Sequence, residues 1–305
     1  MKKKNIIITG VAGFIGSSFA NILNNKSYTI YGIDDLSTGC KESISKNVIF
    51  FKHDLSKGIP KKLESKSVKI DYIFHFAGQS SGEKSFEDPI SDLQRNTVTT
   101  LNLIKFSIKK KIKRFFYMSS MSVYGDANYA SEKSKFNPKT CYGVSKITSE
   151  LYLKIYEKEL SYTIFRLFNV YGPSQRLDNL KQGMIRIYIS QLIKTNKIIV
   201  KGSLERSRDF IYIDDLVEIF LKLMNYKKSP GLIVNIGTGK KTTVKKIISI
   251  LQNLRKDVKI TIAPSTKGDQ QNIYANINKL KKITSIKKFT SIEDGIKIFY
   301  KKAIN

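Results

Sequence analysis

The sequence predicts an α/β protein built on a doubly wound parallel sheet, and three observations support this fold class. Short runs of β-branched and aromatic residues alternate with stretches of helical spacing through the first half of the chain. A glycine-rich turn joins the first strand-like run to the first helical stretch, and no internal repeat or low-complexity linker interrupts the alternation. Strands that alternate with helices pair in parallel and place the helices on both faces of the sheet.

Most of the predicted elements lie in the first half of the chain. We expect strands where β-branched and aromatic residues are concentrated, at residues 5–9, 28–34, 48–52, 71–77, 114–120 and 162–168. We expect helices where apolar residues recur at spacings of three and four, at residues 14–24, 93–110 and 142–160.

The second half of the chain is less regular. A loop that contains Gly172 and Pro173 precedes a predicted helix at residues 182–195 and a short strand at residues 198–202. Residues 232–239 have the pattern of one more core strand that ends in a glycine-rich turn. We therefore expect a first domain at residues 1–168 and a smaller one at residues 169–305, with the segment 232–239 returning to the sheet of the first domain.

Length and composition limit the class of protein. A chain of 305 residues that is 41% hydrophobic can bury a sizeable core, and it offers no run of about 18 apolar residues that would span a membrane. Cys40 and Cys141, with His53 and His75, form neither a disulfide framework nor a spaced metal site. A soluble cytoplasmic protein with reduced thiols and no metal is expected.

The formal charge of +29 raises the question of a nucleic-acid or membrane partner. Of the 54 basic residues, 46 are lysine and 8 are arginine, and the lysines are scattered through most of the chain. Proteins that recognise base sequence favour arginine at the base contacts. We attribute the charge to a general compositional bias and expect neither partner.

A phosphate-binding turn is predicted where the first strand meets the first helix. Gly10, Gly13 and Gly16 allow a tight turn, a close approach of backbone N–H groups to a pyrophosphate, and close packing of the helix. Asp34 follows Gly16 by 18 residues and ends the second strand. A carboxylate there accepts hydrogen bonds from the ribose hydroxyls of a bound dinucleotide and repels a 2′-phosphate, which favours NAD over NADP.

A second group of residues indicates proton transfer. Tyr142 and Lys146 lie four residues apart on a predicted helix and project from one face, and Ser120 ends a predicted strand. We expect the lysine ammonium to lower the pKa of the phenol towards neutral pH. A tyrosinate so placed removes the proton of a substrate hydroxyl while hydride leaves the same carbon.

With these motifs in place, the chain resembles the extended short-chain dehydrogenase/reductase family, and within it the NAD-dependent nucleotide-sugar epimerase/dehydratase group. The resemblance covers nearly the whole chain. It is carried by TGVAGFIGS, GIDDLSTG, HDL, HFAG, RNTVTTLNLI, SVYG, YGVSK, FRLFNVYGP and RDFIYIDDL. It implies a Rossmann sheet with a smaller C-terminal substrate-binding domain, NAD as cofactor, and a nucleotide-diphosphate sugar, above all a UDP-sugar, as substrate. It also implies a homodimer formed through the helices predicted at residues 93–110 and 142–160.

The resemblance further assigns roles to individual residues. Ser120, Tyr142 and Lys146 would be the catalytic residues, and Tyr142 and Lys146 would also contact the cofactor. The cofactor would also be lined by Gly10, Gly13, Phe14, Ile15, Gly16, Asp34, Asp54, Leu55, Phe76, Ala77, Gly78 and Asn96. The substrate would be bound by Ser80, Ser120, Asn169, Arg208, Asp269 and Ile273, with Asn169 and Arg208 on the diphosphate and Ile273 near the substituent at carbon 2.

Three positions depart from the family pattern. Many relatives have Arg-x-Gly-Asp near the C-terminus, whereas this chain has Thr266-Lys267-Gly268-Asp269, so the phosphate contact there passes to Lys267 or is lost. Asp35 stands where asparagine is common, and Cys141 stands where proline is frequent and is expected to pack rather than react.

The residues before VYG indicate which reaction is catalysed. Related sugar 4,6-dehydratases have an Asp-Glu pair there, and this chain has Met121-Ser122. The remaining groups are sufficient for reversible oxidation at carbon 4, so a UDP-hexose 4-epimerase-like activity through a 4-keto intermediate is expected. A UDP-glucuronate epimerase or decarboxylase, a nucleotide-4-keto-sugar reductase and a non-catalytic nucleotide-binding regulator remain alternatives. The sugar, the nucleobase and the pathway stay open.

Overall fold

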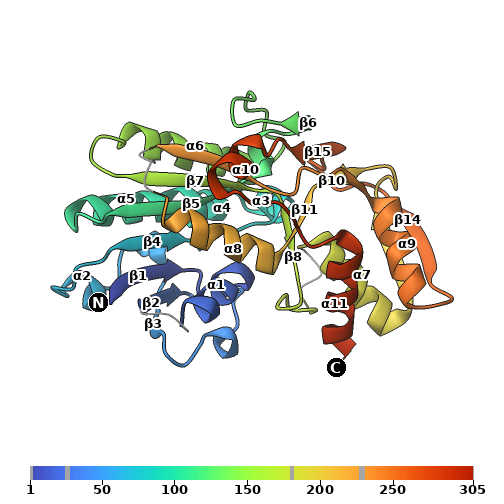
Figure 1. Ribbon diagram of the computed structural model, residues 1–305, viewed down its shortest axis with the longest axis horizontal. Helices are drawn as coiled ribbons and strands as arrows, with labels where there is room; N and C mark the ends of the chain where they lie inside the picture. The colour runs from blue at the N-terminus through green and yellow to red at the C-terminus, as the bar shows by residue number, and fades with distance from the viewer. Residues whose placement is uncertain (1–2, 25–27, 179–181, 227–230, 305) are drawn as a thin grey trace.

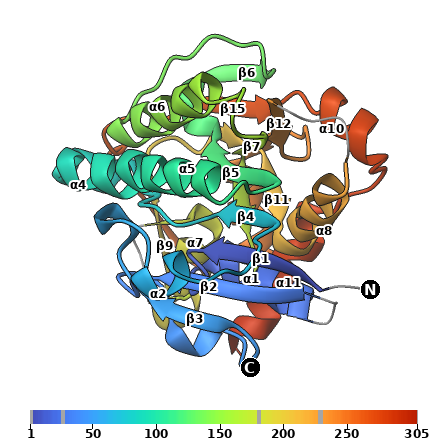
Figure 2. The same cartoon turned by 90° about the vertical axis from the view of Figure 1, so that its left-hand side faces the viewer.

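The computed structural model describes residues 3–24, 28–178, 182–226 and 231–304, and a sheet of seven parallel strands forms the centre of this part of the chain. Figure 2 shows the strands from the upper edge of the sheet to the lower edge. In that order they are β12 (Leu232–Ile236), β7 (Tyr162–Leu167), β5 (Arg114–Ser120), β4 (Tyr72–His75), β1 (Lys4–Thr9), β2 (Tyr28–Asp34) and β3 (Ile49–Lys52). This is the doubly wound fold that the alternating pattern predicts, with the predicted strand at residues 232–239 paired in parallel with β7.

Successive residues of each strand point to opposite faces of the sheet, so apolar side chains cover both faces. On β1, Ile6 and Ile8 point into one hydrophobic cluster and Ile7 into the other, and all three are fully buried. Two helices, α1 (Phe14–Asn24) and α8 (Ile213–Met224), supply the first cluster. Leucine and phenylalanine side chains of α5 (Thr99–Lys109), with Leu153 of α6 (Cys141–Ile155), supply the second. Helices therefore cover both faces of the sheet, as a doubly wound sheet requires.

The C-terminal part of the chain forms a smaller unit beyond the carboxyl ends of the strands, at the right of Figure 1. Its helices are α7 (Met184–Thr195), α9 (Val244–Leu254) and α11 (Ile292–Ile304), whereas α10 (Asn278–Thr284) packs against β12 and α8 beside the main sheet. Its strands pair as β9 (Lys197–Lys201) with β14 (Lys259–Ala263), β8 (Asn169–Tyr171) with β11 (Phe210–Tyr212), and β10 (Ser207–Arg208) with β13 (Thr242–Thr243) and β15 (Asn272–Ala275). A strand from the first half, β6 (Ala127–Ala130), joins β15, and the short helices α2 (Lys61–Glu64) and α3 (Gly82–Glu87) complete the layers. No helix within the described ranges is long and apolar enough to cross a bilayer.

The predicted helix at residues 93–110 is not continuous. It divides into α4 (Pro89–Leu93), a π-helical turn at Gln94–Val98, and α5. Within the π turn, the carbonyl oxygen of Asn96 accepts a hydrogen bond of 2.6 Å from the Thr100 hydroxyl. A π turn adds a residue to one helical turn, and such turns recur at functional sites. Apolar spacing alone does not reveal it.

A buried ion pair holds α6 against the sheet. Arg166 on β7 binds the carboxylate of Glu150 on α6 at 2.6 Å, and both side chains are 3% exposed. Glu150 also accepts a hydrogen bond from Ser119 on β5. Arg166 donates to the Tyr124 hydroxyl at 2.9 Å, which in turn donates to Asn235 on β12 at 2.6 Å. One network therefore joins α6 to three neighbouring strands.

Glu150→Gln should lower the free energy of unfolding by about 3–5 kcal/mol, because Arg166 would keep its buried charge without a counter-charge. The double variant Glu150→Gln/Arg166→Met should lose less than the sum of the two single changes, since it leaves no unpaired charge. Glu159→Gln, at an exposed glutamate after α6, is the control. Urea unfolding of the wild type and the four variants, Arg166→Met included, measures the changes, and a loss below about 1 kcal/mol for Glu150→Gln would contradict the role assigned to the pair.

Candidate active site

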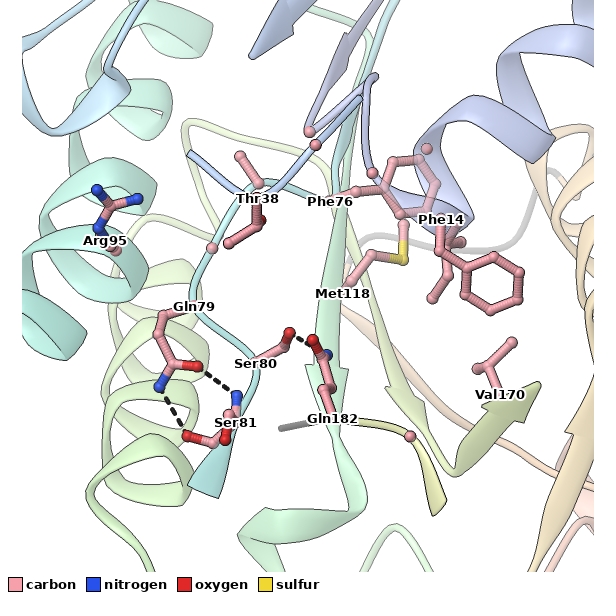
Figure 3. Close-up of a pocket in the computed structure, with 18 of the residues that line it drawn as sticks. Phe14, Thr38, Phe76, Gln79, Ser80, Ser81, Arg95, Met118, Val170 and Gln182 are labelled. Carbon is pink, nitrogen blue, oxygen red and sulfur yellow. Dashed lines mark hydrogen bonds between the residues drawn. The ribbon is translucent and has the colours of Figure 1, made fainter. Parts of the chain in front are cut away.

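A cavity of about 1120 Å³ lies where the carboxyl ends of the strands meet the C-terminal unit. Parallel sheets of this kind bind ligands at that edge. Figure 3 shows residues from both sides of the cavity, with Phe14 from α1, Phe76 after β4, Met118 from β5 and Val170 from β8 facing the same space. The volume accommodates two ligands of nucleotide size.

The glycine-rich turn forms one end of the cavity. Gly10 has a φ of +67°, and a Cβ there would stand 2.6 Å from the backbone nitrogen of Ala77. A Cβ on Gly16 would collide with the carbonyl oxygen of Gly10, so α1 packs directly on the turn. A Cβ on Gly13 would meet only that same oxygen, at 3.2 Å, which leaves this side of the turn open. The turn thus presents α1 and its backbone N–H groups to the cavity, which fits a pyrophosphate.

Asp34 holds this end of the cavity together. Its Oδ2 accepts from the backbone N–H of Ala12 at 3.0 Å, and its Oδ1 accepts from that of Leu36 at 2.9 Å. Burial raises the pKa of the carboxyl, and these two hydrogen bonds oppose the rise. A carboxylate accepts more than two hydrogen bonds, so Asp34 keeps capacity for the hydroxyls of a ribose. Of the other residues assigned to the cofactor, all except Asn96 line the cavity: Phe14, Ile15, Asp54, Leu55, Phe76, Ala77 and Gly78.

Ser120, Tyr142 and Lys146 lie together at the centre of the cavity wall. Thr140 caps the N-terminus of α6, which begins at Cys141 and so places Tyr142 in its first turn. Tyr142 forms a hydrogen bond with Ser120, whose hydroxyl also accepts from the backbone N–H of Ser122 at 3.2 Å. Lys146 donates to the Met118 carbonyl at 2.9 Å, with its Nζ 5.6 Å from the centre of the Tyr142 ring.

The expected lowering of the pKa of Tyr142 by Lys146 is wrong for this arrangement. Burial raises the pKa of Tyr142 to about 12, with Ser120 opposing and Asp92 adding to the rise. Burial also lowers the pKa of Lys146 to about 8, against the attraction of Asp92 and Glu150. The reason is that burial disfavours the charged form of both groups more than their proximity favours it.

Asp92 is a buried polar residue that the motifs do not reveal. It is 1% exposed, and its carboxylate accepts from Ser145 at 2.6 Å, Gln79 at 2.8 Å and Asn96 at 3.1 Å. Asn96 does not line the cavity, but its Oδ1 is buried without a hydrogen-bond partner among the described residues, beside Gly78. In the sequence, Asp92 is only an aspartate three residues after a helical proline. That is a weak signal for a buried site residue, because the burial of Asp92 depends on the π turn and on α6.

The substrate side of the cavity is formed by residues from both units. Ser80, after β4, accepts a hydrogen bond from Gln182, just before α7, and Figure 3 shows the two side chains meeting across the cavity. Asn169 at the start of β8 also lines the cavity, and its amide donates to the carbonyl oxygen of Asp209 at 3.1 Å.

Three other residues assigned to the substrate, Arg208, Asp269 and Ile273, lie outside the cavity lining. Arg208 binds Asp269 at 2.9 Å and donates to the carbonyl oxygen of Ser207 at 2.9 Å. Ile273 on β15 is fully buried. Lys267, the alternative phosphate contact, stands 4.5 Å from the centre of the Phe86 ring. The sequence motifs did not identify Arg186, which lines the cavity. The signal that could have identified it is an arginine within an otherwise apolar helical run.

The fold and the site together define a dinucleotide-dependent enzyme of the extended short-chain dehydrogenase/reductase type. The chain belongs to the NAD dependent epimerase/dehydratase family, whose sequence model matches residues 6–237. NAD is therefore its cofactor, and the glycine turn with Asp34 fits that group.

Known relatives are similar over nearly the whole chain. A putative UDP-glucose 4-epimerase of Methanocaldococcus jannaschii is 34% identical over 254 residues, which cover 81% of each protein. The crystal structure of UDP-glucose 4-epimerase from Thermotoga maritima with UDP-glucose is 29% identical, with a TM-score of 0.91 over 99% of this chain and 100% of that one. The UDP-N-acetylglucosamine 4-epimerase of Methanobrevibacter ruminantium, in complex with UDP-N-acetylmuramic acid, is also 29% identical, with a TM-score of 0.91 over 100% of this chain and 99% of that one.

The lowered pKa of Lys146 predicts a pH dependence of stability. Between about pH 8 and 10.5 the folded protein binds fewer protons at this site than the unfolded chain, so stability from this group rises with pH. From pH 7 to pH 9.5 the wild type should gain about 2 kcal/mol relative to Lys146→Met, which lacks the titrating group. Urea unfolding at the two pH values measures the difference. Lys154→Met, at an exposed lysine of α6, should follow the wild type; parallel behaviour of Lys146→Met and wild type would refute the assignment.

Proposed function

We propose that this enzyme inverts carbon 4 of a nucleotide-linked hexose, with a UDP-hexose as the preferred substrate. One observation carries the proposal: Met121 and Ser122 line the cavity directly after Ser120, where the related dehydratases have their acidic pair. Neither side chain is a suitable acid or base at neutral pH. Removal of water from carbons 5 and 6 therefore lacks its proton donors and acceptors at this position, whereas oxidation and reduction at carbon 4 do not need them.

As a phenolate, Tyr142 accepts the proton of the 4-hydroxyl; because burial raises its pKa to about 12, the phenol must first lose its own proton to solvent. Ser120, which hydrogen-bonds to Tyr142, is placed to hold the same substrate oxygen and to align the transfer. Lys146 keeps its ammonium fixed on the Met118 carbonyl and adds positive charge beside the phenol as the proton moves. NAD, when bound, would supply the acceptor and the donor of the hydride at carbon 4. Epimerisation then requires the 4-keto sugar to present its other face before Tyr142 gives the proton back.

We propose the assigned cofactor contacts as the binding residues for NAD, with Asp34 on the ribose. Support comes from the shape of the glycine turn and from the position of Asp34 beside it. Asn169 and Ser80 are proposed as substrate contacts because both line the cavity, Ser80 against Gln182 and Asn169 next to Val170. The UDP-sugars named for the two solved structures described above support a ligand of that class.

We also propose a homodimer formed through α4 and α6. Both helices carry large apolar side chains on exposed positions, where a solvated helix would carry polar ones. These residues are Ile90, Leu93, Val144, Leu151, Tyr152 and Ile155. A second copy of the chain that packs this face against its own would bury them. The sequence led us to expect residues 93–110 on this face, whereas the exposed apolar residues lie on α4, before most of that range. A cytoplasmic location fits the free thiols of Cys40 and Cys141.

Incubation with UDP-glucose, and separately with UDP-GlcNAc, should yield the epimer with an axial 4-hydroxyl. Proton NMR should show its signals appearing while mass spectrometry shows an unchanged product mass and no net NADH forms. A product lighter by one water would indicate a dehydratase. Carbon dioxide from UDP-glucuronate would indicate a decarboxylase, and stoichiometric NADH would indicate a net oxidoreductase.

Ser120→Ala should reduce kcat by about 100-fold or more, because Ser120 bonds to the general base, whereas Ser122→Ala should reduce it by less than about 10-fold. Both serines line the cavity and are hydrogen-bonded to each other at 3.1 Å, so the pair is matched in position. Steady-state kinetics on the best substrate measures the effect. The reverse order of the two variants would show that Ser122 is the catalytic hydroxyl.

A further inference from the structure

A second cavity, of about 590 Å³, lies apart from the active-site cavity, and the two share no lining residue among those the structure describes. It is formed by the first turn of α8, the turn after β12, helix α10 and residues 287–294, where the chain enters α11. A cavity of this volume accommodates a small molecule. No step of the proposed reaction involves it, so its role has to be inferred from its own residues.

Lysine is concentrated on the wall of this second cavity. It accounts for 4 of the 10 lining residues, against 46 of the 305 residues of the chain. The four are Lys240 after β12, Lys281 on α10, and Lys287 and Lys288 before α11. The active-site cavity has many more lining residues, yet only two of those described are lysines. The general lysine bias of the chain therefore does not account for this concentration.

The four ammonium groups have no hydrogen-bond or ion-pair partner within the described ranges of the chain. The two carboxylates of the cavity are engaged by other groups. Asp215 accepts from the backbone N–H and the hydroxyl of Thr290 at 2.8 and 3.1 Å, and Asp294 accepts from the Ser291 hydroxyl at 2.6 Å. Four cations and two anions leave the cavity with a net charge of +2. A concave surface with one prevailing sign of charge attracts ions of the opposite sign.

The segment that carries two of the lysines is held in place before any ligand enters. The hydrogen bonds of Thr290 to Asp215 fasten it to α8, and Phe289 is partly buried against the main hydrophobic cluster. The Ser291 hydroxyl caps α11 by accepting from the backbone N–H three residues later, at 3.0 Å. A site that is already ordered loses less conformational entropy when it binds a ligand.

The residue types of the cavity indicate the chemistry of the ligand. Planar carboxylates are matched by the fork of arginine, and no arginine is among the described lining residues. Lysine binds as a point charge and suits phosphate groups. The net charge of +2 calls for a ligand with at least two negative charges, and the concave shape suits a small molecule better than a duplex. We propose that this second cavity binds a small anion that carries two or more phosphate charges.

Isothermal titration of pyrophosphate into the protein saturated with NAD and UDP tests the proposal, because these ligands fill the active-site cavity. The wild type should bind one pyrophosphate per chain in the second cavity. Lys287→Gln/Lys288→Gln should raise the Kd about 10- to 100-fold, the loss typical of charge-assisted contacts. Pyrophosphate should also raise the Tm of the wild type but not that of the variant. Without pyrophosphate the two proteins should have the same Tm, because the replaced lysines are exposed and have no partner.

Lys301→Gln/Lys302→Gln is the matched control. These two exposed lysines lie in the last turn of α11, outside both cavities, so the variant removes the same charge from a neighbouring part of the chain. At an ionic strength of about 0.15 M, salt screens charges that lie more than about 8 Å away. The control should therefore bind pyrophosphate as the wild type does. An equal loss of affinity in the two double variants would show a general attraction to the basic chain and would overturn the proposal.

Orthophosphate and fructose 1,6-bisphosphate, titrated in the same way, identify the source of the phosphate charge. A bisphosphate that binds more tightly than pyrophosphate would identify an organic ligand, and the reverse order an inorganic one. Orthophosphate should bind more weakly than either, and equal affinity for orthophosphate and pyrophosphate would contradict the requirement for two phosphate charges. If neither pyrophosphate nor the bisphosphate bound, the proposal would fail. A duplex oligonucleotide that bound through Lys287 and Lys288 in that case would assign these lysines to nucleic acid.

Discussion

The buried pair of Glu150 and Arg166 is the constraint on which the geometry of the site depends. Glu150 lies one helical turn after Lys146 and two turns after Tyr142, so fixing its carboxylate fixes the rotation of α6 about its own axis. Arg166 and Ser119 hold that carboxylate from two adjacent strands. The phenol and the ammonium consequently face the cavity because residues further along the helix cannot turn. The pair gives precision to the site, although an ion pair of this kind is weak evidence for net stability.

Charged groups are buried in the same region, which is electrostatically unfavourable. Lys146 is buried within the influence of two carboxylates, Asp92 and Glu150, which oppose the effect of burial on its pKa. Asp92 in turn is satisfied by a serine, a glutamine and an asparagine, so its charge is stabilised by dipoles as well as by the lysine. Burial outweighs the attraction of the two carboxylates and lowers the pKa of Lys146 to about 8, so its neutral form becomes accessible just above neutral pH.

The sequence was sufficient to predict those features that are formed by residues close together in the chain. The glycine turn, α1 and the strand that ends at Asp34 follow one another within 34 residues, and their roles could be inferred from spacing. The positions of Tyr142 and Lys146 on one helix could be inferred in the same way. The return of residues 232–239 to the main sheet could also be inferred, because a nearly continuous apolar run is typical of a strand buried on both faces.

Features that depend on contacts between residues far apart in the sequence could not be predicted from the spacing of residue types. The π turn before α5 is not recorded by the apolar spacing of the sequence. The engagement of Arg208 by Asp269 joins residues 61 positions apart, so a motif that contains only one of them cannot show that the arginine is already bound. The elevated pKa of Tyr142 depends on the depth of burial, which is a property of the finished fold.

The place of β12 at the edge of the main sheet has a consequence for synthesis of the chain. Until residue 236 has left the ribosome, β7 is the outer strand of the growing sheet, with every residue apolar or inward-facing in the finished protein. An exposed strand edge of this kind readily pairs with another chain. The N-terminal half can thus form most of the sheet early, but it stays prone to aggregation until the strand from the C-terminal half covers β7. Chains cut short between residues 168 and 232 would carry that open edge permanently.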